Sequence, residues 1–188
     1  MLEEFLRSFQ ILEEEEIAAF TNKTVSRQLK KGEFLITEGK ISKYIAFIQS
    51  GVFRSFYRSS ETEEVTYCFT FENTIITAYT SWITQLPTNE NIEAMTDMDL
   101  KLISKDHMNQ LEDAYPNWVK FFKKVAENEY MNLERRIFML QRESAETRYH
   151  DLLKHHPEYL HSLPLQYLSS YLGITQRHLS RIRKNLSF

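Results

Sequence analysis

The residues between Thr24 and Ser104 constrain the fold most, because they follow a strand pattern throughout. Short runs of Val, Ile, Phe, Tyr and Thr alternate with turn residues, as is typical of β-strands. Gly32, Gly39 and Gly51 stand between consecutive runs, where a positive φ costs glycine little. This close spacing favours a double-stranded jelly roll. We predict strands at residues 24–30, 33–38, 44–50, 52–59, 64–71, 74–79, 91–96 and 98–104.

Helical periodicity flanks this region on both sides. Apolar residues on helical spacing predict a helical segment over 2–20, a short helix over 105–113 and a long helix after Pro116. Further helices are expected at 145–156, with Ser144 as N-cap, and after Pro164. We therefore predict an α+β chain. Its parts are a β-domain at residues 1–115, a long helix at 116–141 and a helical domain at 142–188.

The long helix carries an apolar stripe with spacings of 4, 7, 4 and 3 residues. A heptad-like stripe of this kind is typical of a helix that pairs with a second helix. The alternative is that the helix packs only on its own β-domain. We expect the stripe also to meet its copy in a homodimer. The stripe consists of Phe122, Ala126, Leu133, Ile137 and Leu140.

Residues 163–188 contain two helical halves around Gly173, each with one apolar face. Gly173 permits a tight turn, and Thr175 can cap the second half. This spacing predicts a helix-turn-helix. The apolar faces consist of Leu165, Leu168, Tyr171 and Leu172 in the first half and of Leu179, Ile182 and Leu186 in the second.

The charge of the chain also points to this C-terminal segment. Residues 144–188 hold 6 Lys and Arg against 3 Asp and Glu, whereas residues 1–143 hold 17 against 23. A basic end on an acidic body favours a polyanionic partner such as DNA, although a solvated basic tail would look the same. We expect Arg177 and Arg181 to read bases, Arg183 and Lys184 to hold phosphates, and Gln176 to do either. The candidate DNA-binding residues are Thr175, Gln176, Arg177, His178, Ser180, Arg181, Arg183 and Lys184.

Three segments together resemble the Crp/Fnr superfamily of transcriptional regulators. They are KKGEFLITEGKISKYIAFIQSGVFRSFY, LERRIFMLQRESAETRYHDLL and YLGITQRHLSRIRK. The resemblance implies a cyclic-nucleotide-binding-type β-domain, a dimerisation helix and a C-terminal DNA-binding domain. It further implies a homodimer that binds a pseudo-palindromic site in double-stranded DNA, with RNA polymerase as a further partner. DNA binding would be controlled by an unknown small-molecule effector, or it would be constitutive.

The sequence departs from the family pattern in the expected effector region. Nucleotide-binding members hold the ribose with a Gly-Glu pair and the cyclic phosphate with an Arg, whereas Thr77 and Ala78 stand at the first place and Asn89 near the second. A buried phosphate would lack its bidentate partner, so we expect an apolar pocket that does not bind cyclic AMP or cyclic GMP. The candidate pocket residues are Tyr67, Phe69, Thr77, Ala78, Tyr79, Trp82 and Asn89.

Other features limit the remaining function classes. Cys68 is the single cysteine, which excludes an iron–sulfur cluster and fits a reducing, cytoplasmic compartment. A cupin-like metalloenzyme is not expected, because His107 is the only histidine before residue 144. We expect no cofactor, no metal, no membrane span and no β-wing after the second helix. A zinc site among His150, His155, His156, His161 and His178 is conceivable, and a solvated helix end is favoured.

One alternative from a different function class stays open. The chain could keep the β-domain and the dimerisation helix while its C-terminal module binds protein. It would then be an interaction or signalling module without specific DNA binding.

Overall fold

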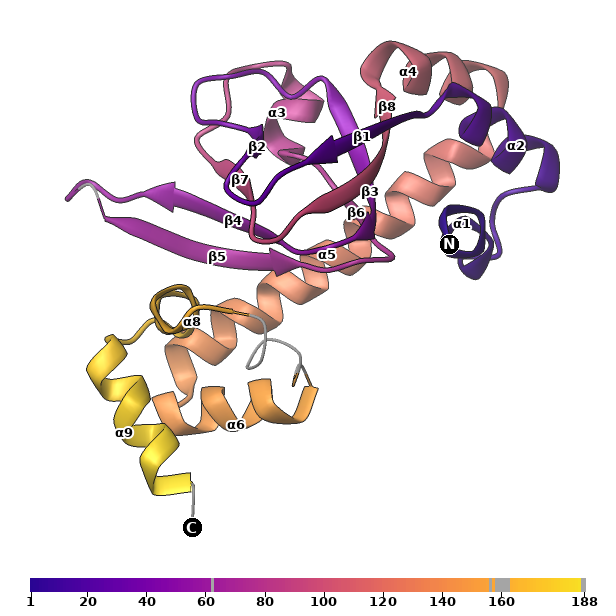
Figure 1. The fold of residues 1–188 in the computed structure, drawn as a ribbon. Coiled ribbons are helices and arrows are strands. Elements are labelled where there is room, and N and C mark those ends of the chain that lie inside the picture. The colour runs from indigo at the N-terminus through magenta and orange to yellow at the C-terminus, as the bar shows by residue number, and fades with distance from the viewer. Residues whose placement is uncertain (62, 156, 158–162, 187–188) are drawn as a thin grey trace. The chain divides into compact units, whose positions relative to one another are not determined.

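The computed structural model describes residues 1–61, 63–155, 157 and 163–186 (Figure 1). The chain separates into two compact units. The first, which we call the β-unit, consists of Met1–Tyr57 and Phe69–Ala126. The second, which we call the helical unit, consists of Arg58–Cys68 and Glu127–Phe188. The segment Arg58–Cys68, which includes the first part of a strand that starts at Glu64, is thus grouped with the C-terminal helices, which the sequence did not suggest.

The strands form two four-stranded sheets, in the orders β1-β8-β3-β6 and β2-β7-β4-β5. The pairs β1–β8, β3–β8, β3–β6, β2–β7 and β4–β7 are antiparallel. Every strand falls within its predicted range, which confirms the α+β class. The strands are β1 (Val25–Leu29), β2 (Phe34–Ile36), β3 (Tyr44–Ser50), β4 (Phe53–Arg58), β5 (Glu64–Thr70), β6 (Ile75–Ile76), β7 (Asn91–Ala94) and β8 (Met98–Ser104).

One prediction about this region is wrong. The strand expected over 74–79 ends at Ile76, and the short helix α3 (Tyr79–Thr84) follows it. The residues of α3 are rich in Thr, Tyr and Ile, which favour strands, so local propensity gave no sign of a helix. Tertiary packing stabilises the helix instead, because α3 buries Trp82 and Ser81 on one side.

An apolar core lies between the two sheets. Strand β3 shows how it forms, because successive side chains point to opposite faces of a strand. Ala46 and Ile48 face this core, whereas Ile45 and Phe47 belong to a second cluster on the other face. The core between the sheets consists of Leu29, Ala46, Ile48, Phe53, Ile76, Ala78, Ile92, Ala94, Met98, Leu100 and Leu102.

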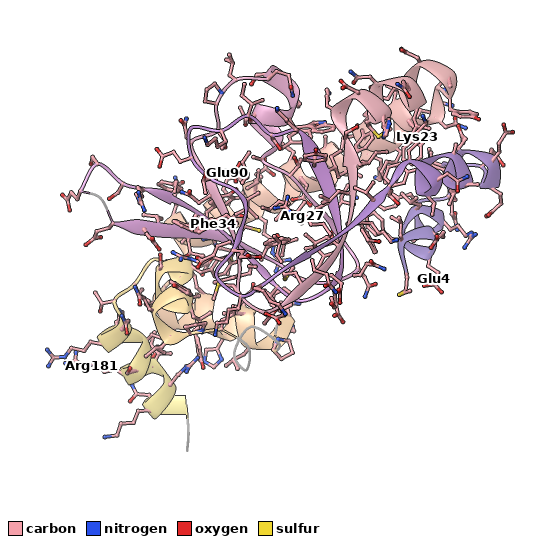
Figure 2. All side chains as sticks on the ribbon, turned by 45° about the horizontal axis from the view of Figure 1, so that its top comes forward. Glu4, Lys23, Arg27, Phe34, Glu90 and Arg181 are labelled. Atoms are coloured by element: carbon pink, nitrogen blue, oxygen red, sulfur yellow. The ribbon has the colours of Figure 1, made fainter. Side chains whose placement is uncertain are left out.

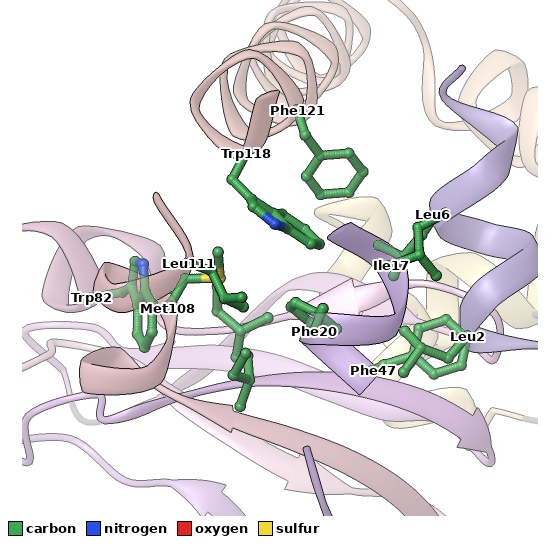
Figure 3. Close-up of a cluster of buried hydrophobic side chains, with 12 residues drawn as sticks. Leu2, Leu6, Ile17, Phe20, Phe47, Trp82, Met108, Leu111, Trp118 and Phe121 are labelled. Atoms are coloured by element: carbon green, nitrogen blue, oxygen red, sulfur yellow. The ribbon is translucent and has the colours of Figure 1, made fainter. Parts of the chain in front are cut away.

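The second cluster joins the helices to the outer face of β3 (Figure 3). It includes side chains from α1 (Leu2–Ser8), α2 (Glu14–Lys23) and α4 (Lys105–Ala114). The ring of Phe20 stacks on that of Trp118 with centroids 4.8 Å apart. Trp118 belongs to the first turn of α5 (Asn117–Arg142), so the long helix begins inside this core.

In its described residues the helical unit contains the second half of α5 and the shorter helices α6 (Ala145–His155), α8 (Leu165–Leu172) and α9 (Gln176–Leu186). The oxygen Oγ of Ser144 accepts a hydrogen bond from the backbone N–H of Thr147 at 3.1 Å, which confirms Ser144 as the N-cap of α6. Of the helices in the described ranges, none is both long and apolar enough to cross a membrane. Among the described residues of the C-terminal helices, the buried apolar side chains are Tyr149, Leu152, Leu163, Leu168, Leu172, Leu179 and Ile182.

Candidate nucleic-acid interface

The turn between α8 and α9 has the geometry that the sequence predicts. Gly173 adopts φ +67°, and its N–H donates to the Ser170 carbonyl at 3.0 Å. The N–H of Ile174 donates to the Ser169 carbonyl at 3.0 Å, which closes the C-terminus of α8. Thr175 Oγ1 accepts from the N–H of His178 at 3.2 Å and so caps α9. These bonds fix where α9 begins and how it leaves α8.

One face of α9 is buried and the opposite face is exposed. Leu179 and Ile182 are 0% and 2% exposed and pack into the helical unit. The exposed face has residues spaced 3, 1 and 3 apart, which places them together on one side of a helix. Figure 2 shows the Arg181 side chain extending from α9 away from the neighbouring helices. The exposed face consists of Arg177, Ser180, Arg181 and Lys184.

The remaining candidates on α9 have other surroundings. Gln176 and His178 are exposed at the start of the helix, and Thr175 is used as the cap. Arg183 is half-buried, and its guanidinium carbon lies 5.9 Å from the ring centroid of Tyr149 on α6. Arg183 follows Leu179 by four positions, so it lies beside the apolar face. The structure therefore separates Arg183 from the exposed face, although the sequence suggested a phosphate contact.

Charge favours a polyanion at this surface. The exposed face of α9 carries three cationic side chains, and no Asp or Glu follows Glu158 in the sequence. The N-terminal end of a helix also carries a partial positive charge. Arg can bind guanine through two hydrogen bonds in the major groove, and both Lys and Arg bind phosphates. The side chains on this face are therefore of the types that contact phosphates and base edges.

Neighbouring contacts hold α6 against α5. Arg148 Nη1 donates to the carbonyls of Leu140 and Glu143 at 3.2 and 2.8 Å, which satisfies acceptors at the C-terminus of α5. Arg135 Nη2 lies 3.1 Å from Asp151 Oδ1, which ties the two helices together. These contacts fix α6 against the C-terminal part of α5 within the helical unit.

The predicted stripe on α5 divides into two parts. Phe122 packs against the core of the β-unit, and Ala126 is half-buried. Leu133 and Ile137 are 51% and 50% exposed, and Leu140 is exposed as well. Among the described residues of the stripe, only Leu133, Ile137 and Leu140 are therefore exposed enough to contact a second chain.

The C-terminal half of α5 exposes three further apolar residues outside the predicted stripe. Tyr130 continues the predicted stripe, because it lies four positions after Ala126 and three before Leu133. The helical spacing is a signal for Tyr130, because this residue occupies the gap of seven positions between Ala126 and Leu133 in the predicted stripe. Met131 and Phe138 lie seven positions apart on a different side of the helix, beside a groove that Arg135, Met139 and Arg142 also line.

The candidate effector residues in the β-unit belong to different packing environments. Ala78 belongs to the core between the sheets, whereas Trp82 belongs to the helix-facing cluster, where Lys105 Nζ lies 4.6 Å from its ring centroid. Thr77 Oγ1 donates to the Tyr44 carbonyl at 2.9 Å. These positions serve packing and turn formation.

The other effector candidates are also dispersed. Tyr79 and Asn89 are exposed, and Phe69 is buried in β5. Tyr67 is half-buried in the part of β5 that belongs to the helical unit. An effector pocket formed by these residues remains a prediction.

Metal ligands are not assembled in the parts of the chain that the structure describes, since no three His, Cys, Asp or Glu side chains there could share an ion. His155 Nε2 lies 3.6 Å from Asp151 Oδ1, one turn earlier on α6. His156 and His161 lie outside the described residues. His107 is exposed on α4, where its backbone N–H donates to the Ser104 hydroxyl.

Comparison with known proteins supports the architecture. Residues 26–115 match the family model of the cyclic nucleotide-binding domain. FixK2 from Bradyrhizobium japonicum is similar with a TM-score of 0.75 at 16% identity, over 87% of this chain and 84% of that chain. The c-di-GMP responsive global regulator CLP of Xanthomonas campestris gives 0.72 at 16% identity, over 93% and 91%. No curated protein sequence matches the chain.

A protein from Eubacterium rectale assigned to the Crp/Fnr family is also similar, with a TM-score of 0.74 at 15% identity, over 97% of this chain and 87% of that chain. The matched residues 26–115 contain both sheets, and the long helix and C-terminal helices complete the likeness. The resemblance found in the sequence is therefore confirmed. The chain has the fold of these Crp/Fnr regulators, and its residues 26–115 match the cyclic nucleotide-binding domain.

Proposed function

We propose that this chain is a DNA-binding transcriptional regulator of the Crp/Fnr type. The observation that carries the proposal is the exposed face of α9, where Arg177, Ser180, Arg181 and Lys184 lie opposite the buried Leu179. A helix of this kind enters the major groove with its N-terminal residues against base edges. The proposal also agrees with the solved relatives, which include regulators rather than enzymes.

We further propose that the chain acts as a homodimer through the C-terminal half of α5. Tyr130, Leu133, Ile137 and Leu140 form an exposed apolar seam with spacings of 3, 4 and 3 residues. A seam of this spacing packs against a copy of itself in a coiled coil. A two-fold axis along this seam would present two copies of α9, which suits an inverted-repeat site.

The test is selection of bound duplexes from a random library with the full chain. The proposal expects an enriched sequence with two inverted half-sites, whose centres lie about 10 base pairs or a multiple of that spacing apart. Affinity for the enriched duplex should fall as salt rises, because phosphate contacts release counterions. Failure to enrich any sequence would reject specific DNA binding and favour the protein-interaction alternative.

The proposed regulator is not expected to respond to cyclic AMP or cyclic GMP. Ala78 is fully buried in the apolar core between the sheets, and Asn89 is exposed and uncharged where an Arg would be needed. An anionic phosphate buried without a cationic partner is strongly unfavourable. Isothermal titration calorimetry should detect no binding of either nucleotide, and micromolar affinity would contradict this part of the proposal.

A further inference from the structure

Ser170 on α8 is bound to the edge of β5. The backbone N–H of Thr66 donates to Ser170 Oγ at 2.9 Å, and Ser170 Oγ donates to the carbonyl of Glu64 at 3.2 Å. Residues 64 and 66 are two apart in a strand, so their backbone groups point to the same side. β5 is the last strand in the order β2-β7-β4-β5 (Figure 1). One hydroxyl group thus binds two backbone groups of the same strand.

The next residue on α8 is bound to α5. Arg136 Nη2 donates to the carbonyl of Tyr171 at 2.8 Å, and its guanidinium carbon lies 3.9 Å from the centroid of the Tyr171 ring. That carbonyl is in the last turn of α8, where acceptors lack a partner within the helix and a cation is favourable. Burial raises the pKa of the Tyr171 hydroxyl, and the nearby Arg136 charge partly offsets the effect. Two consecutive residues of α8 are therefore held by two different elements.

Both of these elements continue from the helical unit into the β-unit. β5 leaves the helical unit after Cys68, and α5 crosses the boundary between Ala126 and Glu127. α8 in turn determines the direction of α9 through the hydrogen-bonded turn at Gly173. A shift of β5 or α5 must therefore either carry α8 along or break these contacts.

We propose that Ser170 and Arg136 are positioning residues that hold α8, and through it α9, in the orientation that reads DNA. The inference rests on the proposed function. The direction of the effect follows from exposure, because Arg177, Ser180 and Arg181 are exposed within the helical unit while both contacts are formed. The held orientation is thus one in which the basic face is accessible.

The structural part of the proposal can be tested without DNA. In Ser170→Ala the amide of Thr66 loses its acceptor, so its hydrogen exchange should accelerate by about two- to tenfold, the range expected for one hydrogen bond. Ser169→Ala is the matched control, because Ser169 Oγ donates only within α8, to the carbonyl of Gln166 at 2.9 Å. Ser170→Thr keeps the hydroxyl and should restore slow exchange. Unchanged Thr66 exchange in Ser170→Ala would overturn the proposal.

The positioning role is tested by comparing two duplexes. Ser170→Ala and Arg136→Ala should weaken binding to the selected duplex several-fold, and Ser170→Thr should restore it. Binding of Ser170→Ala to a scrambled duplex should not change, because the charge of the protein is the same. Equal losses on both duplexes, or the same loss in Ser169→Ala, would contradict a positioning role.

The melting temperature of each variant separates positioning from loss of the fold. The proposal expects Ser170→Ala to lose specific affinity while it melts near the wild-type temperature, and a loss of affinity that only follows unfolding would reject it. If the wild-type chain binds the selected and the scrambled duplex equally, specific DNA binding is rejected. The role of Ser170 and Arg136 in DNA reading is then rejected as well. The exchange of Thr66 would still show whether the contact between α8 and β5 exists.

Discussion

Basic residues close together on α9 have different surroundings. Arg181 and Arg183 are two positions apart, so their side chains leave the helix about 200° apart. Arg181 is exposed, whereas Arg183 packs near the ring of Tyr149. The sequence shows their charge and helical phase, but it does not show where α6 lies. For this reason Arg183 could not be distinguished from Lys184 in advance.

We predict that the arginines of α9 separate into two classes on substitution. Arg177→Ala and Arg181→Ala should each weaken binding to the selected duplex by about 1–3 kcal/mol while the melting temperature stays unchanged. Arg183→Ala should instead lower the melting temperature, because a cation–π contact contributes about 0.5–1 kcal/mol. Binding titrations and thermal melts of the variants measure both effects. An unchanged melting temperature with a smaller salt slope in Arg183→Ala would return that residue to the phosphate-binding class.

A second prediction at this scale concerns Asp97 in the β-unit. Lys30 Nζ lies 2.8 Å from Asp97 Oδ2, and this hydrogen bond, together with the Lys31 N–H, holds the pKa of the carboxyl below its usual range. A depressed pKa in the folded state means stabilisation above the unfolded pKa, which is lost as pH falls through the folded value.

Asp97→Asn should therefore reduce the acid sensitivity of the fold. Urea midpoints of the wild type and the variant, measured from about pH 7 to about pH 3, should converge as the carboxyl protonates. The effect should be small, because both side chains are largely exposed. A constant difference in midpoint across this range would show that the ion pair is not its source.

At the scale of elements, periodicity predicted most of the architecture. The alternation of residues such as Ile45, Ala46 and Phe47 has a physical cause, since β3 must bury one set between the sheets and the other beneath the helices. The turn at Gly173 was predictable because only a short polar or glycine residue adopts a left-handed φ at low cost. The helix α3 was not predictable, because its stabilisation comes from burial of Trp82 rather than from its own sequence.

The candidate sites were predictable to different degrees for a related reason. The candidate DNA-binding residues lie on one helix, so helical phase alone places Arg177 and Arg181 together. The effector residues come from separate strands and loops, and their meeting depends on long-range packing. The structure places Ala78 and Trp82 in different cores, which no local pattern could show.

We predict that the seam on α5 holds the dimer. The double variant Leu133→Asp and Ile137→Asp should sediment as a monomer, because it places like charges at the centre of the apolar seam. Met131→Asp with Phe138→Asp is the matched control, since these exposed apolar residues lie on another side of α5. The control should remain a dimer. A dimer that persists in the first variant and dissociates in the second would move the interface to the other side of α5.

The whole molecule is organised by two elements that both units share. β5 and α5 each contribute to the β-unit and to the helical unit, and each contacts α8 through Ser170 or Arg136. The charge also differs along the chain. Residues 1–143 hold more acidic than basic residues, whereas residues 144–188 hold more basic than acidic residues. An acidic body discourages non-specific contact with DNA outside the basic end. This division agrees with the proposal that the basic residues of α9 contact a duplex.

The most direct measurement of the central claim is a titration of the wild-type chain against the selected duplex and a scrambled duplex at several salt concentrations. The account predicts that the selected duplex binds at least about 10³-fold more tightly at physiological salt, the lower bound for specific recognition. Both affinities should fall with salt, because both depend on phosphate contacts. Equal affinity for the two duplexes at every salt concentration would contradict base reading by α9, and no binding to either would contradict DNA binding altogether.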